Sequence, residues 1–399
     1  MKNLLYISFL NEDIRPGYKN KIHSQAKSFV DLGFDSKLFI VKNYCLCLYS
    51  FDKNRNETIE REYQFLKKRS RKERNIKDEF VLFKQFVKIT QEIVKEKKVN
   101  VVYIRRIVPI TPKLLYLVSA LKNSGVYVIY EYPTWPWKNE IISKKNKKIR
   151  DYCFYFLDSF LYKKLIKNIN LLTYIGECNI RNKKFMKIIN CIDIDNYPLH
   201  QQPQSETIHL IGVAHVAYYH GYDKIILGLK KYYEKKQSRK VIFDIVGNVD
   251  PALGLEKIVE KFNLDECVRF HGFKKDKELD LLFEISNIGV NSLSIEEVLK
   301  NVKGITTLKT GEYTARGLPQ IGQKPFELAN GKIEKPEFLY IIEQDKEYVD
   351  IEKVVEFYDS LSITAKDIRD YGRLKLSWQL TFKPIIDKYQ IDIKKNKKE

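Results

Sequence analysis

Short apolar runs alternate with segments of helical periodicity along almost the whole of this 399-residue chain. Continuous apolar runs are typical of strands that are buried on both faces of a sheet. When such strands alternate with helices they predict parallel, doubly wound sheets, so we expect an α/β fold. The predicted strands are residues 3–10, 36–41, 100–105, 125–130, 171–175, 185–190, 208–213, 241–247, 268–270, 288–293, 318–322 and 338–343.

The segments between these runs carry the predicted helices, because their apolar residues recur at helical spacing. The long segment at residues 52–98 is helical in tendency and very basic. The other predicted helices are residues 22–32, 112–123, 144–168, 222–235, 255–262, 277–284, 354–360, 364–373 and 377–389.

The length of the chain predicts two domains, because one hydrophobic core rarely serves so many residues. Composition turns polar and proline-bearing at residues 197–204, which is typical of a domain boundary. We therefore expect one domain at residues 1–200 and a second at residues 201–380. Residues 381–399 are expected to form a C-terminal helix and a basic tail.

A formal charge of +20 predicts anionic partners, which could be nucleotide phosphates, lipid headgroups, lipid pyrophosphates or nucleic acid. The densest basic run, residues 67–74, is either a solvated surface or a footing on anionic lipid. Residues 144–168 combine a cationic start with an aromatic stripe, which suits an interfacial helix or a helix packed on the core. The basic runs match no nucleic-acid module, so we expect no nucleic-acid partner.

Cysteine usage predicts a cytoplasmic protein, since the six cysteines are scattered and lack the spacing of a disulfide framework or a zinc site. Residues 4–10 are too short an apolar run for a signal peptide, and no run is long enough to span a membrane. Histidines show no ligand spacing, so we expect no metal. The protein is thus predicted to be cytoplasmic, with peripheral attachment to the inner face of the cell membrane left open.

Residues 306–319 read as a short helix with a threonine cap, a glycine stop and a proline beyond. Lys309, Glu312, Tyr313 and Arg316 fall on one face of this helix, which makes the face a candidate site. The alternative is a solvated stripe that is held by weak ion pairs.

Two loops of the first domain are candidate sites because they follow predicted parallel strands, where open α/β sheets bind ligands. Gly17 precedes a helix whose N-terminus could bind an anion, or is simply a turn residue. Residues 131–137 combine a carboxylate with aromatic side chains. Their alternative role is a rigid aromatic loop that packs against a neighbouring helix.

Several motifs occur in an order that resembles the GT-B glycosyltransferases, in particular the retaining family 4 enzymes of bacterial surface polysaccharide synthesis. The resemblance covers nearly the whole chain. It rests on residues 131–137 (Glu-Tyr-Pro-Thr-Trp-Pro-Trp), 189–193 (Ile-Asn-Cys-Ile-Asp), 220–224 (His-Gly-Tyr-Asp-Lys), 243–247 (Phe-Asp-Ile-Val-Gly), 268–273 (Val-Arg-Phe-His-Gly-Phe), 308–313 (Leu-Lys-Thr-Gly-Glu-Tyr) and 317–319 (Gly-Leu-Pro).

The resemblance implies two Rossmann-like domains that face one another across a cleft, with a C-terminal helix returning toward the first. It implies a hexosyltransferase that moves a sugar, with retention and without a metal, from a nucleotide sugar such as a UDP-sugar. The acceptor would be a lipid-linked sugar or an oligosaccharide in polysaccharide biosynthesis. No cofactor beyond the nucleotide-sugar donor is implied.

Roles for single residues also follow from the resemblance. Glu312 would bind the ribose hydroxyls, and the leaving diphosphate would be stabilised by Lys309 or Arg316, helped by His215 or His220. The amides that hold the diphosphate would be those of Thr306, Thr307 and Leu308, the base would lie near Gly247 and Asn248, and the acceptor would contact Arg15, Gly17, Tyr18, Arg105, Arg106, Glu131 and Trp135.

The chain departs from the family pattern where relatives carry a first glutamate, since this position is Gly304. That departure keeps open a catalytically silent GT-B subunit that binds glycan or a partner transferase. An epimerase or phosphorylase of this fold is a second rival, although the pyridoxal phosphate lysine motif is not found. Asp193 and Asp195 match the metal-binding Asp-x-Asp of the other glycosyltransferase fold, but their place at the linker argues against a metal.

Overall fold

The computed structural model describes residues 2–12, 16–43, 45–65, 76–138, 148–177, 182–201, 203, 205–235, 239–295, 303–343 and 346–396. The chain divides into two compact units. Unit 1 comprises Met1–Ile189 together with Trp378–Glu399, and unit 2 is Asn190–Ser377. Among the described residues, no helix is long and apolar enough to cross a membrane.

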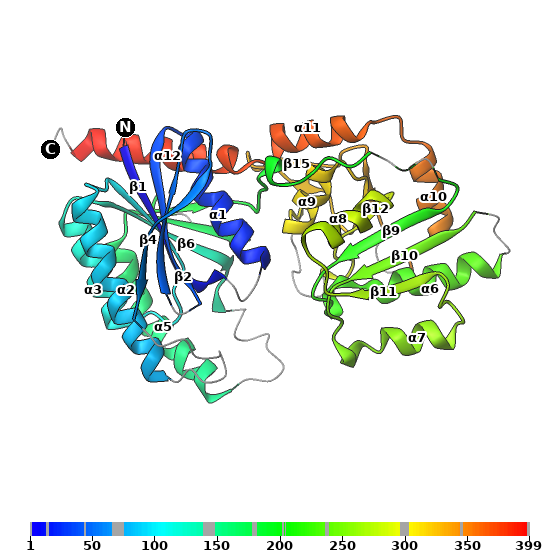
Figure 1. The fold of residues 1–399 in the computed structure, drawn as a ribbon, viewed down its shortest axis with the longest axis horizontal. Helices are drawn as coiled ribbons and strands as arrows, with labels where there is room; N and C mark the ends of the chain where they lie inside the picture. The colour runs from blue at the N-terminus through cyan, green and yellow to red at the C-terminus, as the bar shows by residue number, and fades with distance from the viewer. Residues whose placement is uncertain are drawn as a thin grey trace. The chain divides into compact units, whose positions relative to one another are not determined.

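Unit 1 is built on an eight-stranded sheet with the order β4-β3-β2-β1-β5-β6-β7-β8 (Figure 1). Neighbours from β2 through β1 to β8 pair in parallel, and β3 and β4 add an antiparallel edge. The strands are β1 (Lys2–Asn11), β2 (Phe34–Lys42), β3 (Cys45–Phe51), β4 (Glu57–Gln64), β5 (Val101–Arg105), β6 (Tyr127–Trp135), β7 (Leu171–Gly176) and β8 (Phe185–Lys187).

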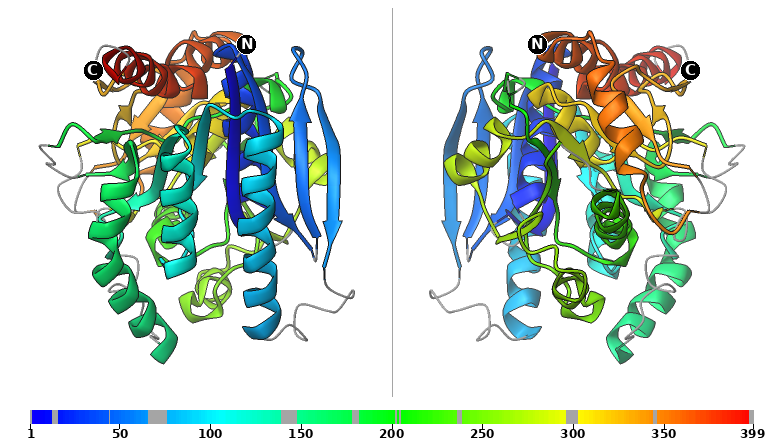
Figure 2. Two further views of the ribbon diagram at one scale, coloured as in Figure 1. Left: turned by 90° about the vertical axis from the view of Figure 1, so that its left-hand side faces the viewer. Right: turned by 90° about the vertical axis from the view of Figure 1, so that its right-hand side faces the viewer.

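Helices cover both faces of this sheet. Alternate residues of each strand point to opposite faces, and the apolar side chains on each face are buried under helices. Leu5 and Ile104 belong to a core shared with α2, α3 and α5, which stand side by side in Figure 2. Tyr6 and Tyr103 point the other way, toward α1 and α12, where Tyr103 contacts Phe29 and Phe382. The helices are α1 (Pro16–Asp31), α2 (Ile76–Glu96), α3 (Pro112–Asn123), α5 (Ile149–Asn168) and α12 (Trp378–Asn396).

The helical prediction for residues 52–98 is wrong in its first part, where Glu57–Gln64 forms strand β4. Its sequence, ETIEREYQ, is largely exposed and charged, as is common for an edge strand that must not pair with other chains. Such a strand lacks the continuous apolar run on which the strand predictions relied. Strand β3 (Cys45–Phe51) was not predicted either. Helix α2 at Ile76–Glu96 confirms the second part. The basic run at residues 67–74 lies outside the described residues.

Unit 2 is built on a parallel six-stranded sheet with the order β11-β10-β9-β12-β13-β16, flanked by helices (Figure 1). The predicted α/β fold is therefore confirmed in both units. Its strands are β9 (Ile208–Val213), β10 (Val241–Val246), β11 (Val268–Gly272), β12 (Ile288–Val290), β13 (Gln320–Gly322) and β16 (Leu339–Ile341), with a small hairpin of β14 (Phe326–Glu327) and β15 (Ile333–Glu334). The helices are α6 (Tyr222–Glu234), α7 (Leu255–Lys261), α8 (Asp276–Glu284), α9 (Leu308–Arg316), α10 (Ile351–Asp359) and α11 (Ala365–Lys375).

The units divide at Ile189 and Ser377, whereas the predicted divisions were at residues 200 and 380. Residues after Ile189 belong to unit 2 because Ile192 and Ile194 pack with Ala315 of α9. Helix α12 belongs to unit 1, where the Phe382 ring stacks on Phe29 with centroids 4.8 Å apart. Apolar contacts made by these short segments, rather than the polar composition near residue 200, therefore define the units.

Candidate functional site

The candidate site of unit 2 lies where its strand order reverses, between β9 and β12. Ligands of open α/β sheets bind beyond the carboxyl ends of the strands at such a point. The loop at residues 214–217 follows β9, and the loop at residues 291–294 follows β12. Helix α9 is tied to the second loop, because the Thr310 hydroxyl donates to Asn291 Oδ1 at 3.1 Å.

Helix α9 has the predicted caps. The Thr307 side chain accepts from the amide of Thr310 at 3.1 Å, and Gly317 ends the helix with a φ of 82°. The Thr307 amide donates to the Thr310 hydroxyl at 3.3 Å, so the capping box uses that amide. The Thr306 hydroxyl donates to the carbonyl of Glu327 at 2.5 Å. Leu308 is the first residue of the helix, where backbone amides are free of helical partners.

Lys309 stands in the first turn of α9 and its ammonium donates to the Ser292 hydroxyl at 3.0 Å. The side chain is half-buried, and this burial lowers the pKa of Lys309 to about 7. A cation that is held at a helix N-terminus can stabilise a bound anion. Its charge depends on the surroundings, because a nearby anion would raise the pKa again.

Tyr313 does not face solvent but anchors α9 under the site. Its hydroxyl accepts from the amide of Val213 at 3.1 Å and lies 3.3 Å from the carbonyl of Val290, so it joins the ends of β9 and β12. A Cβ atom at Gly289 would lie 2.4 Å from the Tyr313 ring, which explains glycine there. The alternative of a solvated stripe on this helix is therefore excluded for Tyr313.

Arg316 is also buried, with 4% of its side chain exposed. It donates to Glu312 Oε1 at 3.2 Å, to Asp280 Oδ1 at 2.8 Å and to His200 Nε2 at 2.8 Å. Its guanidinium lies 4.0 Å from the centroid of the Phe283 ring. These contacts hold Arg316 within unit 2 and make it a positioning group for Glu312.

Glu312 keeps 19% of its side chain exposed while one oxygen accepts from Arg316. Burial raises the pKa of Glu312, and the charge of Arg316 opposes that rise. The remaining carboxylate oxygen has lone pairs available for hydroxyl donors. Glu312 is thus oriented by Arg316 and open on one side.

His220 is buried in the turn before α6, where its Nδ1 lies 2.9 Å from the amide nitrogen and 3.1 Å from the carbonyl oxygen of Ala217. Burial lowers the pKa of His220 to about 3, and the charge of Lys309 contributes to the shift. The ring is therefore neutral and carries one N–H donor. His220 can donate a hydrogen bond, but it cannot supply the positive charge that the resemblance implied. His215 is exposed in the loop after β9.

Gly247 and Asn248 follow β10 and lie against the loop after β9. The Asn248 carbonyl accepts from the amide of Val216 at 2.8 Å. Gly247 has a φ of 121°, and a Cβ atom there would lie 1.8 Å from the carbonyl oxygen of Ala214. The close approach of these two loops therefore requires glycine at this position.

A cavity opens beside the start of α9, between the ends of β12 and β13. Its lining is rich in hydroxyl and amide side chains. It is formed by Asn291, Ser292, Ile295, Ile305, Thr307, Thr310, Gly322, Gln323, Lys324, Phe326 and Leu339. The cavity suits a polar ligand that receives hydrogen bonds from several directions.

In unit 1 the structure brings together some predicted acceptor residues but buries them. Glu131 is fully buried and accepts from Arg105 at 2.9 Å and from the Tyr103 hydroxyl at 2.9 Å. The ring of Tyr18, which is exposed, has its centroid 5.7 Å from the Arg105 guanidinium. Tyr18 can therefore contact a ligand, whereas Glu131 can act only through its neighbours. Arg15 lies outside the described residues, and Gly17 is in the first turn of α1.

Residues 131–137, which were predicted as a loop, are mostly strand, because β6 runs as far as Trp135. Their aromatic side chains pack against their neighbours, as the alternative role proposed. Trp135 contacts Tyr162 of α5 with centroids 6.0 Å apart. Trp137 is buried, and the Arg106 guanidinium lies 5.3 Å from its ring centroid. Arg106 also donates to Asp158 at 3.0 Å, so its charge is neutralised inside the unit.

Similar solved structures identify the architecture. A sucrose-phosphate synthase from Thermosynechococcus elongatus superposes with a TM-score of 0.64 at 11% identity, covering 98% of this chain and 99% of that one. A glycosyltransferase from Rickettsia africae gives a TM-score of 0.59 at 13% identity, with coverage of 98% and 99%. HepE of Anabaena in complex with UDP gives 0.55 at 11% identity, with coverage of 98% and 100%.

The chain has the GT-B fold. No protein-family model matches the sequence, and no sequence among the curated proteins is significantly similar to it. At these low identities the fold is preserved by the pattern of buried strands and helices, while most individual residues differ.

The neighbours of Gly304 leave little room for a side chain at this position. A Cβ atom there would lie 2.6 Å from Cδ1 of Ile333 in β15 and 3.2 Å from the amide of Glu327. A glutamate there would require the end of the Ile333 side chain to move and the backbone at Glu327 to shift slightly.

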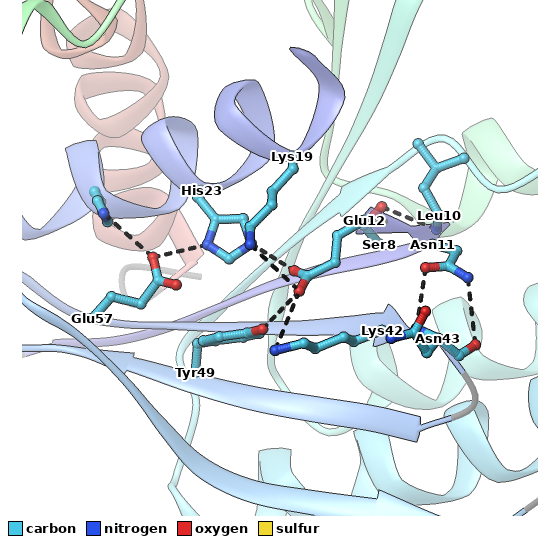
Figure 3. Close-up of polar contacts among 11 residues, drawn as sticks. Ser8, Leu10, Asn11, Glu12, Lys19, His23, Lys42, Asn43, Tyr49 and Glu57 are labelled. Carbon is cyan, nitrogen blue, oxygen red and sulfur yellow. Dashed lines mark hydrogen bonds and ion pairs between the residues drawn. The ribbon is translucent and has the colours of Figure 1, made fainter. Parts of the chain in front are cut away.

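One polar cluster of unit 1 was missed from the sequence (Figure 3). His23 of α1 lies between two carboxylates, with Nε2 2.8 Å from Glu12 Oε2 and Nδ1 2.9 Å from Glu57 Oε2. Tyr49 donates to Glu12 Oε1 at 2.8 Å. Burial would lower the pKa of His23, but hydrogen bonds to the two carboxylates outweigh burial and raise it. The four residues come from separate elements, so no local spacing could have indicated the cluster.

Proposed function

We propose that this protein is a hexosyltransferase that moves a sugar from a UDP-sugar to a lipid-linked or oligosaccharide acceptor in polysaccharide biosynthesis. The reaction would proceed with retention and without a metal, in the cytoplasm and at the inner face of the cell membrane. The observation that carries the proposal is the placement of Lys309 and Glu312 on α9 at the switch point of unit 2. The likeness to HepE, which was solved with UDP, supports the choice of nucleotide.

Donor binding would use the polar groups around the start of α9. Glu312, oriented by Arg316, would accept from the ribose hydroxyls through its open oxygen. The diphosphate would lie against the amide of Leu308 and the ammonium of Lys309. The base would lie near Gly247 and Asn248, where backbone groups of two loops meet.

Transfer would be driven by stabilisation of the leaving diphosphate. As the bond from the anomeric carbon to the phosphate oxygen breaks, negative charge grows on the diphosphate. Lys309 and the N–H of the neutral His220 ring would stabilise that charge, and a fixed cation there would take the place of a metal. Retention needs no protein nucleophile if the leaving phosphate oxygen accepts the proton of the attacking acceptor hydroxyl on the same face.

Acceptor contacts would come from unit 1. Tyr18 is exposed and Trp135 is partly buried, so these two side chains could touch an acceptor directly. Arg105 and Glu131 are buried and would position Tyr18 from behind. In this arrangement the buried ion pair fixes geometry rather than binding sugar.

The test is Glu312→Ala, compared with Glu256→Ala on the exposed face of α7. A hydrogen bond to a charged group contributes about 1.5–3 kcal/mol, so UDP-glucose affinity should fall by roughly 10- to 150-fold in the first variant alone. Turnover with a donor found by thermal-shift screening of nucleotide sugars should fall at least as far. Calorimetry measures the affinity, and the unfolding temperature checks that the variant is folded.

Unchanged affinity and turnover in Glu312→Ala would contradict the proposal. If the wild-type chain bound no nucleoside diphosphate by calorimetry, the catalytically silent GT-B subunit would be the better description. If the wild type released nucleotide from the donor without any acceptor, an epimerase-type or hydrolytic reaction would replace transfer.

A further inference from the structure

Helix α5 buries its carboxylates and exposes its aromatic side chains, which reverses the usual pattern of a surface helix. Asp158 is fully buried and Asp151 nearly so. Ile149, Phe156 and Phe160 are 84%, 68% and 75% exposed. Tyr152 and Leu157 are exposed as well. We call these five exposed side chains the α5 stripe.

The inward-facing residues fix this orientation of the helix. Asp158 accepts from the amide of Ile110 at 2.6 Å and from Arg106 at 3.0 Å. Leu161 and Leu165 are buried in the core of unit 1. Rotating α5 to hide the stripe would break the buried ion pair and expose both leucines, so the stripe is a stable feature of the surface.

The three most exposed members of the stripe lie along one line of the helix, and Tyr152 and Leu157 flank that line on either side. With 3.6 residues per turn, Ile149, Phe156 and Phe160 lie within about 20° of one line along the helix surface. At a rise of 1.5 Å per residue, the stripe is about 17 Å long. This shape matches a helix that lies in the plane of a membrane–water interface with its apolar face immersed in the lipid.

The exposed charged residues of α5 itself are all basic. Helix α5 has two acidic residues, Asp151 and Asp158, and both are buried. Lys163, Lys164 and Lys167 extend the exposed face beyond the aromatic residues, and the Lys164 ammonium lies 5.8 Å from the centroid of the Phe160 ring. Lys148 and Arg150 are exposed at the other end.

We propose that the α5 stripe and its flanking lysines dock the protein onto an anionic lipid bilayer. Aromatic side chains favour the headgroup region, and cations beside them are attracted to anionic lipid. Helices α2 and α3 lie on the same side of the sheet as α5 (Figure 2). They also expose Phe80 and Tyr116. This surface would provide the membrane association that is part of the proposed function. Docking itself requires no transferase activity.

The test is sedimentation of the full-length protein with vesicles of about one-third phosphatidylglycerol in phosphatidylcholine at low salt. Phe156→Ser with Phe160→Ser should weaken binding about tenfold or more, because apolar immersion is lost. Lys163→Glu with Lys164→Glu should weaken it at least as much, because two attractions become repulsions. High salt should release the wild type, and vesicles of phosphatidylcholine alone should bind it far less.

Matched controls separate the stripe from bulk charge and apolarity. Leu374→Ser removes another exposed apolar side chain, on α11, and Lys257→Glu with Lys277→Glu changes the net charge by the same amount from unit 2. Both controls should bind as the wild type does. The proposal is overturned if the wild type does not bind anionic vesicles at low salt, or if controls and stripe variants bind equally. It is also overturned if the stripe variants only convert a dimer into a monomer in gel filtration. Loss of transferase activity would leave the vesicle result unchanged, so the two proposals fail separately.

Discussion

At the scale of single residues, burial makes the charge of Lys309 depend on pH and on whether an anion is bound nearby. Its pKa is lowered to about 7, so in the free protein it is partly charged near neutral pH. His220, which faces the same region, is neutral because burial lowers its pKa to about 3. Lys309 is therefore the group whose charge should respond to a bound diphosphate.

UDP-glucose affinity should consequently depend on pH through Lys309. The ammonium is charged below a pKa of about 7, so affinity should fall between pH 6.5 and 8.5, by up to about tenfold per pH unit. Binding above neutral pH should take up a proton, which calorimetry in buffers of different ionisation enthalpy detects. Lys309→Met should bind weakly at every pH and take up no proton, while Lys257→Met should resemble the wild type. A flat profile in the wild type would rule out a titrating Lys309.

At the scale of elements, the cluster around His23 joins four parts of unit 1 (Figure 3). Glu12 directly follows β1, His23 lies on α1, and Tyr49 and Glu57 belong to β3 and β4. Burial would raise the pKa of Glu57, but the hydrogen bond from His23 and nearby positive charges lower it to about 2. The antiparallel edge, whose backbone pairs with β2, is therefore also tied to α1 by charge.

Replacing His23 with glutamine should destabilise unit 1 by about 3 kcal/mol near pH 6, because the buried Glu12 and the partly exposed Glu57 lose the cation between them. The raised pKa of His23 stabilises the fold below its ordinary value of 6.5 and ceases to do so as pH rises through the folded value. The lowered pKa values of Glu12 and Glu57 stabilise it above 4.5 and cease to do so as pH falls. The deficit should thus be largest between about pH 4.5 and 6.5.

Urea unfolding followed by tryptophan fluorescence measures this deficit selectively. The three tryptophans, Trp135, Trp137 and Trp378, all lie in unit 1. His209→Gln is the control, since His209 pairs with Asp244 at 2.7 Å in unit 2 and should leave the tryptophan signal unchanged. An equal tryptophan-detected deficit in both variants would contradict the role of the cluster.

At the scale of the whole molecule, unit 2 is continuous in the chain and its two ends meet. Ile192 donates from its amide to the carbonyl of Leu376 at 2.9 Å, next to the bridge between Ile192 and Ser377. Unit 1, by contrast, is completed by α12, whose Asp392 accepts from the Tyr127 hydroxyl at 2.7 Å. The final helix therefore makes unit 1 depend on both ends of the chain.

The fragment Asn190–Ser377 should consequently fold alone and bind UDP-glucose within about tenfold of the full chain, because the proposed donor groups all lie within it. Circular dichroism with urea tests folding, and calorimetry tests binding. The fragment should not transfer sugar. A folded fragment that binds no nucleotide, alongside a full chain that does, would show that unit 1 supplies an essential part of the donor site.

The sequence by itself determined the α/β class, most strands and helices, and the capped helix α9, because each depends on neighbours within a few residues. It did not indicate β4, whose charged edge position lacks an apolar run. Only the tertiary structure decided the partners of Glu131, Arg316 and His23, and with them which side chains face a ligand and which are neutralised inside. Those partners come from elements far apart in the chain, and packing of the sheets and helices alone determines which buried polar groups meet.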